Sequence, residues 1–120
     1  MRRFCINYWF LRFEEVELLR GGPARDLLSP MRRRHYLAKA AVVDVVVVTP
    51  PCNTHSRARH SGMPGPPPLR DAPFPRGLPE LSAANQRSVD EANMIADLSV
   101  EVLRVAADNG RFALLEFPED

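Results

Sequence analysis

The residues best suited to chemistry in this chain are a cysteine in a proline turn and a glutamate near the C-terminal end. Cys52 directly follows two prolines, which hold its thiol at a fixed position and allow it to be partly exposed. His55, Arg57 and Arg59 follow closely and favour the nucleophilic thiolate form of this cysteine. Glu116 supplies a carboxyl group that can protonate a polarised heterocycle while the thiolate adds to the ring.

Two apolar strands and a helix must position these groups. Ala40–Val48 is a continuous, valine-rich run, which predicts a strand buried on both faces and ended by the prolines before Cys52. Apolar residues at spacings of three and four predict a helix over Val89–Ala107, and Phe112–Phe117 is a second short apolar strand. Strand, helix and strand in this order predict an α/β core with parallel strands. Both strand ends, and with them Cys52 and Glu116, then share one edge, where ligands of open α/β sheets bind.

Polar and glycine residues mark the ends of the predicted helices. Ser82 or Asn85 can cap the start of the long helix, and Asn109-Gly110 supplies a left-handed stop. Ser29-Pro30 is typical of a helix start and predicts a short basic helix that continues through Lys39. The core therefore has a second helix ahead of its first strand.

Two segments fall outside this core. Residues 53–79 form a Pro- and Arg-rich loop, and loops of this length are uncommon in compact domains unless they are functional or disordered. Residues 1–28 form an N-terminal segment of uncertain structure, in which Phe13–Arg20 could form two helical turns. The predicted α/β domain therefore spans residues 29–120.

Composition bounds the class of protein. The chain has 120 residues, of which 45% are apolar and 26% charged, so one globular domain is expected. No apolar stretch approaches the roughly 20 residues of a transmembrane helix. Two cysteines and no signal-peptide cleavage site predict an intracellular, reducing location. Residues 1–76 carry thirteen basic and six acidic side chains, nearly all of the basic ones arginine, and this charge permits a polyanionic partner.

Each candidate side chain also has a simpler interpretation. Cys52 can be an inert buried thiol, Glu116 can be a solvated carboxylate at a strand end, and the nearby arginines can be solvated residues of a flexible loop. Cys52, His55 and His60 show C-x2-H-x4-H spacing, but a structural zinc site needs four ligands. The sequence therefore predicts no metal site.

Two motifs make the sequence similar to the cytosine-C5 DNA methyltransferases. The first is the Pro50-Pro51-Cys52 turn with Ser56 four residues later, and the second is the glutamate motif Leu114–Pro118. The resemblance covers approximately Asp44–Glu119. It implies that residues 29–120 form a partial Rossmann-like, S-adenosylmethionine-dependent methyltransferase fold with a parallel strand–helix–strand core.

The resemblance also implies a role for the matched residues. Cys52 would add to C6 of a cytosine flipped out of the DNA, Glu116 would contact the N3/N4 edge, and S-adenosylmethionine would methylate C5. Pro51 would shape the wall between cofactor and base, and Asp26 would match the acidic residue that contacts the cofactor adenine. The candidates for contact with DNA are Ser56, Arg57 and Arg59.

Part of the family's pattern is missing. Asn53 and His55 stand where the family usually has Gln and an aromatic residue, and no Phe-x-Gly-x-Gly cofactor loop precedes the first strand. We therefore expect a partial domain whose missing motifs are supplied by a second chain or exon. The alternative is a non-catalytic methyltransferase remnant or a nucleic-acid-binding module.

Overall fold

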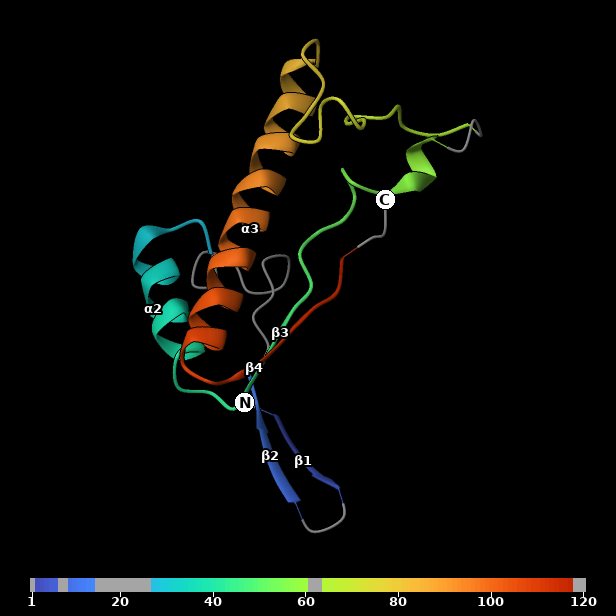
Figure 1. Cartoon of the computed structure of the whole chain (residues 1–120). Helices are drawn as coiled ribbons and strands as arrows, with labels where there is room; N and C mark the ends of the chain where they lie inside the picture. The colour runs from blue at the N-terminus through green and yellow to red at the C-terminus, as the bar shows by residue number, and fades with distance from the viewer. Residues whose placement is uncertain (1, 7–8, 15–26, 61–63, 118–120) are drawn as a thin grey trace.

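The computed structural model describes residues 2–6, 9–14, 27–60 and 64–117 (Figure 1). A β-hairpin comes first, followed by a helix, a strand, a long loop, a long helix and a final strand. The elements are β1 (Arg2–Ile6), β2 (Trp9–Phe13), α2 (Pro30–Ala40), β3 (Val45–Val48), a 3₁₀ helix (Arg57–His60), α3 (Ala83–Asp108) and β4 (Phe112–Leu115).

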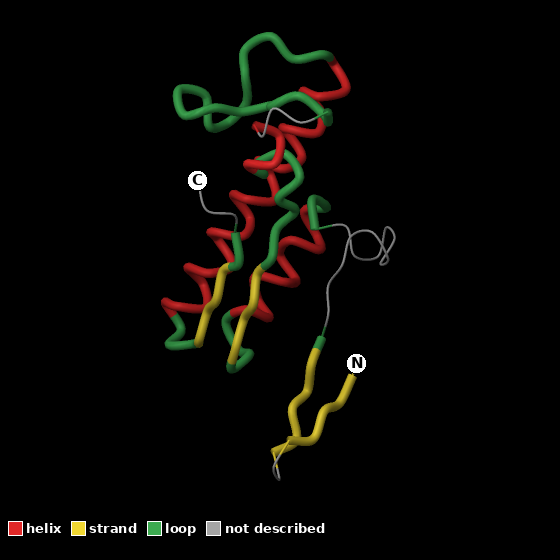
Figure 2. Tube along the Cα trace, turned by 90° about the vertical axis from the view of Figure 1, so that its right-hand side faces the viewer, coloured by secondary structure: helices red, strands yellow, loops and turns green. Residues whose placement is uncertain are grey.

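β3 and β4 form the parallel pair that the sequence predicts. Val45 pairs with Phe112 and Val48 with Leu115, and α3 connects the two strands along the chain. α3 packs against both strands, and α2 packs against α3. Figure 2 shows the strands side by side with the helices behind them. The α/β class and the parallel strand–helix–strand core are therefore confirmed.

The predicted burial of the first strand on both faces is wrong. The strand begins only at Val45, because the first part of the Ala40–Val48 run ends α2 and then turns. Val47 is 57% exposed, and Leu114, its partner on β4, is 60% exposed. In the described part of the chain, helices cover one face of this sheet and leave the other open. Asp44 interrupts the Ala40–Val48 run, and the four valines that follow it do not by themselves supply a second covering layer.

The predictions of α2 and α3 are confirmed. α3 starts at the predicted cap, where the Ser82 hydroxyl accepts a hydrogen bond of 3.3 Å from the amide of Asn85. It ends at Asp108 with Asn109 as its C-cap, and Gly110 then adopts φ +67°. α2 starts at Pro30 after Ser29, as the Ser-Pro pair indicates. The buried residues of α3 are Val89, Ala92, Leu98, Ser99 and Ala106.

The N-terminal segment contains a hairpin of its own. β1 and β2 pair antiparallel, with Arg2 opposite Phe13 and Ile6 opposite Trp9. Phe13 therefore ends a strand, and the prediction that it starts a helical turn is wrong. Residues 15–26 lie outside the described residues. Lys39 at the end of α2 forms an ion pair with Glu14, just beyond the hairpin.

The later part of the Pro-rich loop lies beside the N-terminal end of α3, while the 3₁₀ helix in its earlier part stands away from α3 (Figure 1). Its only regular element in the described part is the 3₁₀ helix. Leu69 is buried in the loop's centre, and its carbonyl accepts a 2.9 Å hydrogen bond from the amide of Leu78. Thr54, Leu69 and Arg70 are therefore the buried residues of a loop that is otherwise half-buried or exposed wherever its side chains are described. No helix in the described ranges is long and apolar enough to cross a membrane.

Gly77 lies close to Val89 of α3. Its φ is +123°, and a Cβ there would lie 2.7 Å from Cγ1 of Val89, which is fully buried. We predict that Gly77→Ala lowers the free energy of unfolding by about 2 kcal/mol, through backbone strain and overpacking. Urea denaturation would measure the change. Gly110→Ala is the matched control for positive φ, since nothing lies within 4 Å of a Cβ there. An equal loss in both variants would show that contact with Val89 adds nothing.

Candidate active site

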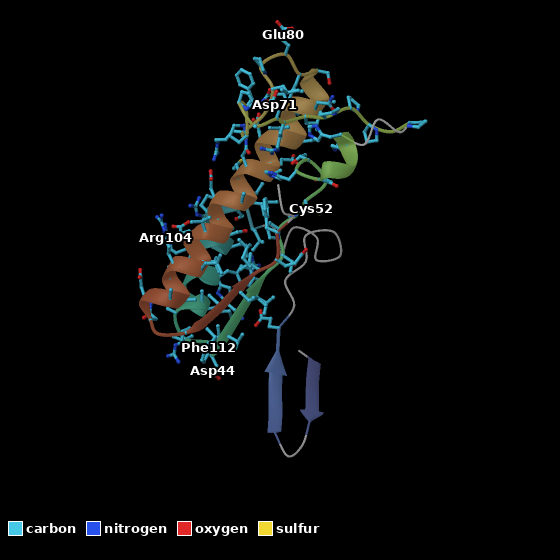
Figure 3. All side chains as sticks on the ribbon, turned by 45° about the vertical axis from the view of Figure 1, so that its right-hand side comes forward. Asp44, Cys52, Asp71, Glu80, Arg104 and Phe112 are labelled. Atoms are coloured by element: carbon cyan, nitrogen blue, oxygen red, sulfur yellow. The ribbon has the colours of Figure 1, made fainter. Side chains whose placement is uncertain are left out.

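The carboxyl ends of β3 and β4 meet at one edge of the sheet. The amide of Glu116, just past β4, donates a 2.9 Å hydrogen bond to the carbonyl of Val48, the last residue of β3. Figure 3 shows Asp44 and Phe112 together at the start of the strands and Cys52 beyond the opposite end. The topology therefore brings the chain around Glu116 next to the strand that leads into the Cys52 turn.

Cys52 opens a tight turn after the two prolines. The amide of His55 donates a 2.9 Å hydrogen bond to the carbonyl of Cys52, and Thr54 is buried within the turn. Cys52 is free and exposed, so the interpretation that this cysteine is buried is wrong. Pro51 beside it is also exposed. The turn thus presents a cysteine to solvent at the strand edge.

An aromatic contact joins this turn to the residues after β4. The rings of His55 and Phe117 meet edge to face, with their centroids 4.8 Å apart and an interplanar angle of 64°. Phe117 directly follows Glu116, so the contact holds the chain on both sides of the site together. The sequence singled out the glutamate but not the phenylalanine beside it. The sequence feature that could have indicated Phe117 is its place as an aromatic residue next to a carboxylate at a strand end.

Arg59 bonds within the loop. Its Nε donates to the carbonyl of Asn53 at 2.5 Å, and its Nη1 donates to the carbonyl of Pro67 at 2.9 Å. The amide of Arg59 also donates to the carbonyl of Ser56, a half-buried residue, at 3.1 Å. Arg57 lies in the 3₁₀ helix. The guanidinium of Arg59 therefore closes the loop on itself next to Cys52.

Arg70 is the main structural residue near the site that the sequence pattern did not predict. Its side chain is buried, with 6% of the residue exposed. Burial lowers the pKa of its guanidinium below the ordinary arginine value, and the cation of Arg76 acts in the same direction. The sequence feature that could have indicated this residue is the Leu69-Arg70 pair inside the long loop. A long loop needs a buried residue in order to pack.

Arg76 itself pairs with α3 at the surface. Its Nη1 and Nη2 donate to the two carboxylate oxygens of Asp97, at 3.0 and 2.9 Å. These hydrogen bonds lower the pKa of Asp97 and raise that of Arg76. Both side chains are more than half exposed, so the pair contributes little to stability. It is an exposed contact between the loop and α3.

Of the two residues predicted to bind S-adenosylmethionine, Asp26 lies outside the described residues. A described open pocket of about 150 Å³ is lined by Leu27, Leu28, Arg33, Met94, Asp97 and Leu98, so it touches neither Pro51 nor Cys52. Small-molecule sites usually have volumes of roughly 300–1,000 Å³. No group of three or more metal-binding side chains occurs in the part of the chain that the structure describes.

Comparison with known proteins does not assign the chain to a family. No protein-family model, curated protein or solved structure matches the chain. The resemblance to cytosine-C5 methyltransferases therefore stays a prediction from the residues around Cys52 and Glu116.

Proposed function

We propose that this chain carries the nucleophile edge of a cytosine-C5 DNA methyltransferase-like domain. The observation that carries the proposal is the exposed thiol of Cys52 in a turn that packs, through His55 and Phe117, against the chain next to Glu116. A thiol and a carboxyl group at one strand edge suit nucleophilic addition to a pyrimidine ring.

The addition step uses only these two side chains. The thiolate of Cys52 forms a bond to C6 of the pyrimidine, and the electrons of the C5–C6 double bond move through the ring to N3. A protonated Glu116 carboxyl group gives its proton to N3 and becomes a carboxylate. This step generates an electron-rich C5, which would attack the methyl group of a donor. S-adenosylmethionine supplies that methyl group in the family that the sequence resembles.

The cofactor site is proposed to need polypeptide beyond the described residues. Two features support a second chain or another exon as its source. The described pocket does not reach Pro51 or Cys52, and the sheet face with Val47 and Leu114 is open. The free thiol of Cys52 also supports a reducing, intracellular compartment.

Covalent trapping tests the proposal without the cofactor. The probe is a single-stranded DNA oligonucleotide containing 2-pyrimidinone, whose ring accepts a thiolate at C6 more readily than cytosine does. A single strand removes the need to flip the base out of a duplex. We expect the wild-type chain to gain the mass of the oligonucleotide and Cys52→Ala to gain nothing. Cys5→Ala, at the chain's other cysteine, is the matched control and should react like the wild type.

Two results would overturn the catalytic proposal. One is an equal adduct in the wild type and in Cys52→Ala, and the other is no adduct in a folded wild-type chain. No adduct together with DNA affinity that falls steeply with salt supports the alternative, a non-catalytic nucleic-acid-binding module.

A further inference from the structure

Arg70 connects the Cys52 turn to the long helix through its guanidinium group. Its Nη2 donates to the hydroxyl of Thr54 at 3.1 Å and to the carbonyl of Val89 on α3 at 3.3 Å. Its Nη1 donates to the side-chain oxygen of Asn93 at 2.8 Å and to the carbonyl of Pro75 at 2.7 Å. One side chain thus joins the turn, the loop and the helix.

The partners of Arg70 are all uncharged. Two backbone carbonyls, a hydroxyl and an amide oxygen accept its four hydrogen bonds, and its buried Nε has no hydrogen-bond partner among the described residues. A buried cation without a carboxylate carries a desolvation penalty, and apolar packing often replaces buried charges without loss of stability. Stability alone therefore does not explain an arginine here. The geometry of its donors explains the presence of arginine better, because only a planar guanidinium group can donate to all four acceptors at once.

Thr54 links the hydrogen bonds of Arg70 to the Cys52 turn. It lies between Cys52 and His55 in the turn, and it is buried while Cys52 is exposed. On the other side of the turn, the His55 ring packs on Phe117. The turn is thus held between α3 and the end of β4.

We infer that Arg70 is a positioning residue, which holds the Cys52 turn in place against α3 through the hydroxyl of Thr54. The inference deepens the proposed function and rests on it for its chemical consequence. A nucleophile must approach its target atom at roughly 3–3.5 Å, and a misplacement of 1 Å can lower a rate by about 10²-fold. Arg70 acts on the position of the thiol and does not touch the pyrimidine.

Hydrogen exchange of the turn tests the positioning without any reaction. Thr54→Val keeps the shape of the side chain and removes the acceptor for Arg70. We expect amide exchange in a peptide covering residues 52–56 to become about tenfold faster, since a hydrogen bond to a charged group is lost. The amide of His55, which bonds to the carbonyl of Cys52, is the main reporter. Thr54→Ser restores the hydroxyl and should restore slow exchange.

The same substitution at the chain's other threonine is the matched control. Thr49→Val lies at an exposed position and should leave exchange in residues 52–56 unchanged. Equal exchange in Thr54→Val and the wild type would overturn the inference. So would failure of Thr54→Ser to restore the wild-type rate. Arg70→Lys provides a second test, because one ammonium group cannot reach all four acceptors, and it should speed exchange at least as much.

The rate of trapping separates this inference from the proposed function. If the wild type forms the pyrimidinone adduct, Thr54→Val should form the same adduct at Cys52 at about one-tenth to one-hundredth of the rate. An unchanged rate would overturn the chemical part of the inference. If the wild type forms no adduct while Thr54→Val still speeds exchange, the proposed function fails and the structural role of Arg70 stands.

Discussion

Glu116→Gln should lower the rate at which Cys52 forms the pyrimidinone adduct by about 10²–10⁴-fold, the usual contribution of a general acid. Glutamine has nearly the same shape, so the backbone bond from residue 116 to Val48 is retained. Its amide cannot transfer a proton to N3. The negative charge that develops on N3 when the thiolate adds is then not neutralised. Quenched time courses followed by intact mass would measure the rate for each variant.

Glu80→Gln is the matched control for this prediction. Glu80 is an exposed carboxylate at the far end of the loop, well away from Cys52 in Figure 3. The substitution there should leave the rate of adduct formation unchanged. A wild-type rate in Glu116→Gln would remove the proton-donor role and leave the nucleophile role of Cys52 untouched. A similar loss in both variants would indicate a general effect of net charge on DNA binding.

Leu69→Ala should lower the free energy of unfolding by about 2–5 kcal/mol. Leu69 is 2% exposed and belongs to the part of the loop that packs on the core. The substitution removes buried methyl groups and leaves a cavity at position 69, which the surrounding chain fills only partly. A loss of this size is a large share of the stability of a small domain, so a lower thermal midpoint is expected. Urea denaturation followed by circular dichroism would measure it.

The same substitution on the open sheet face gives the control. Leu114 on β4 is 60% exposed, so Leu114→Ala should change the free energy of unfolding by less than about 0.5 kcal/mol. A much larger loss at Leu114 would show that another layer covers this face in solution. A small loss at Leu69 would show that the loop does not pack as described.

The local pattern of apolar, capping and glycine residues predicted the helices and strands of the core well. The spacing of apolar residues, the cap at Ser82 and the glycine stop at Gly110 all act within a few residues, so the extent of α3 follows from the chain itself. Parallel pairing of the strands also follows, because a helix between two apolar strands allows the chain to return in the same direction. The shared edge near Cys52 and Glu116 is a consequence of that order.

The covering of each face was decided only by tertiary structure. The valine run that forms β3 is equally compatible with one covering layer or two, and the described chain supplies one. Whether an apolar side chain is buried depends on what packs above it. The spacing of apolar residues along the strand does not encode this. The exposed Val47 and Leu114 follow from this.

The amino-acid sequence by itself determined α2, α3, the two parallel strands and the place of Cys52 just past β3. Only the tertiary structure decided that Arg70 binds Thr54 and that His55 packs on Phe117. These pairs join residues far apart in the chain, through a loop whose proline-rich composition encodes no periodic pattern. Their contacts depend on how the loop closes against α3, and that closure is a property of the packed core as a whole.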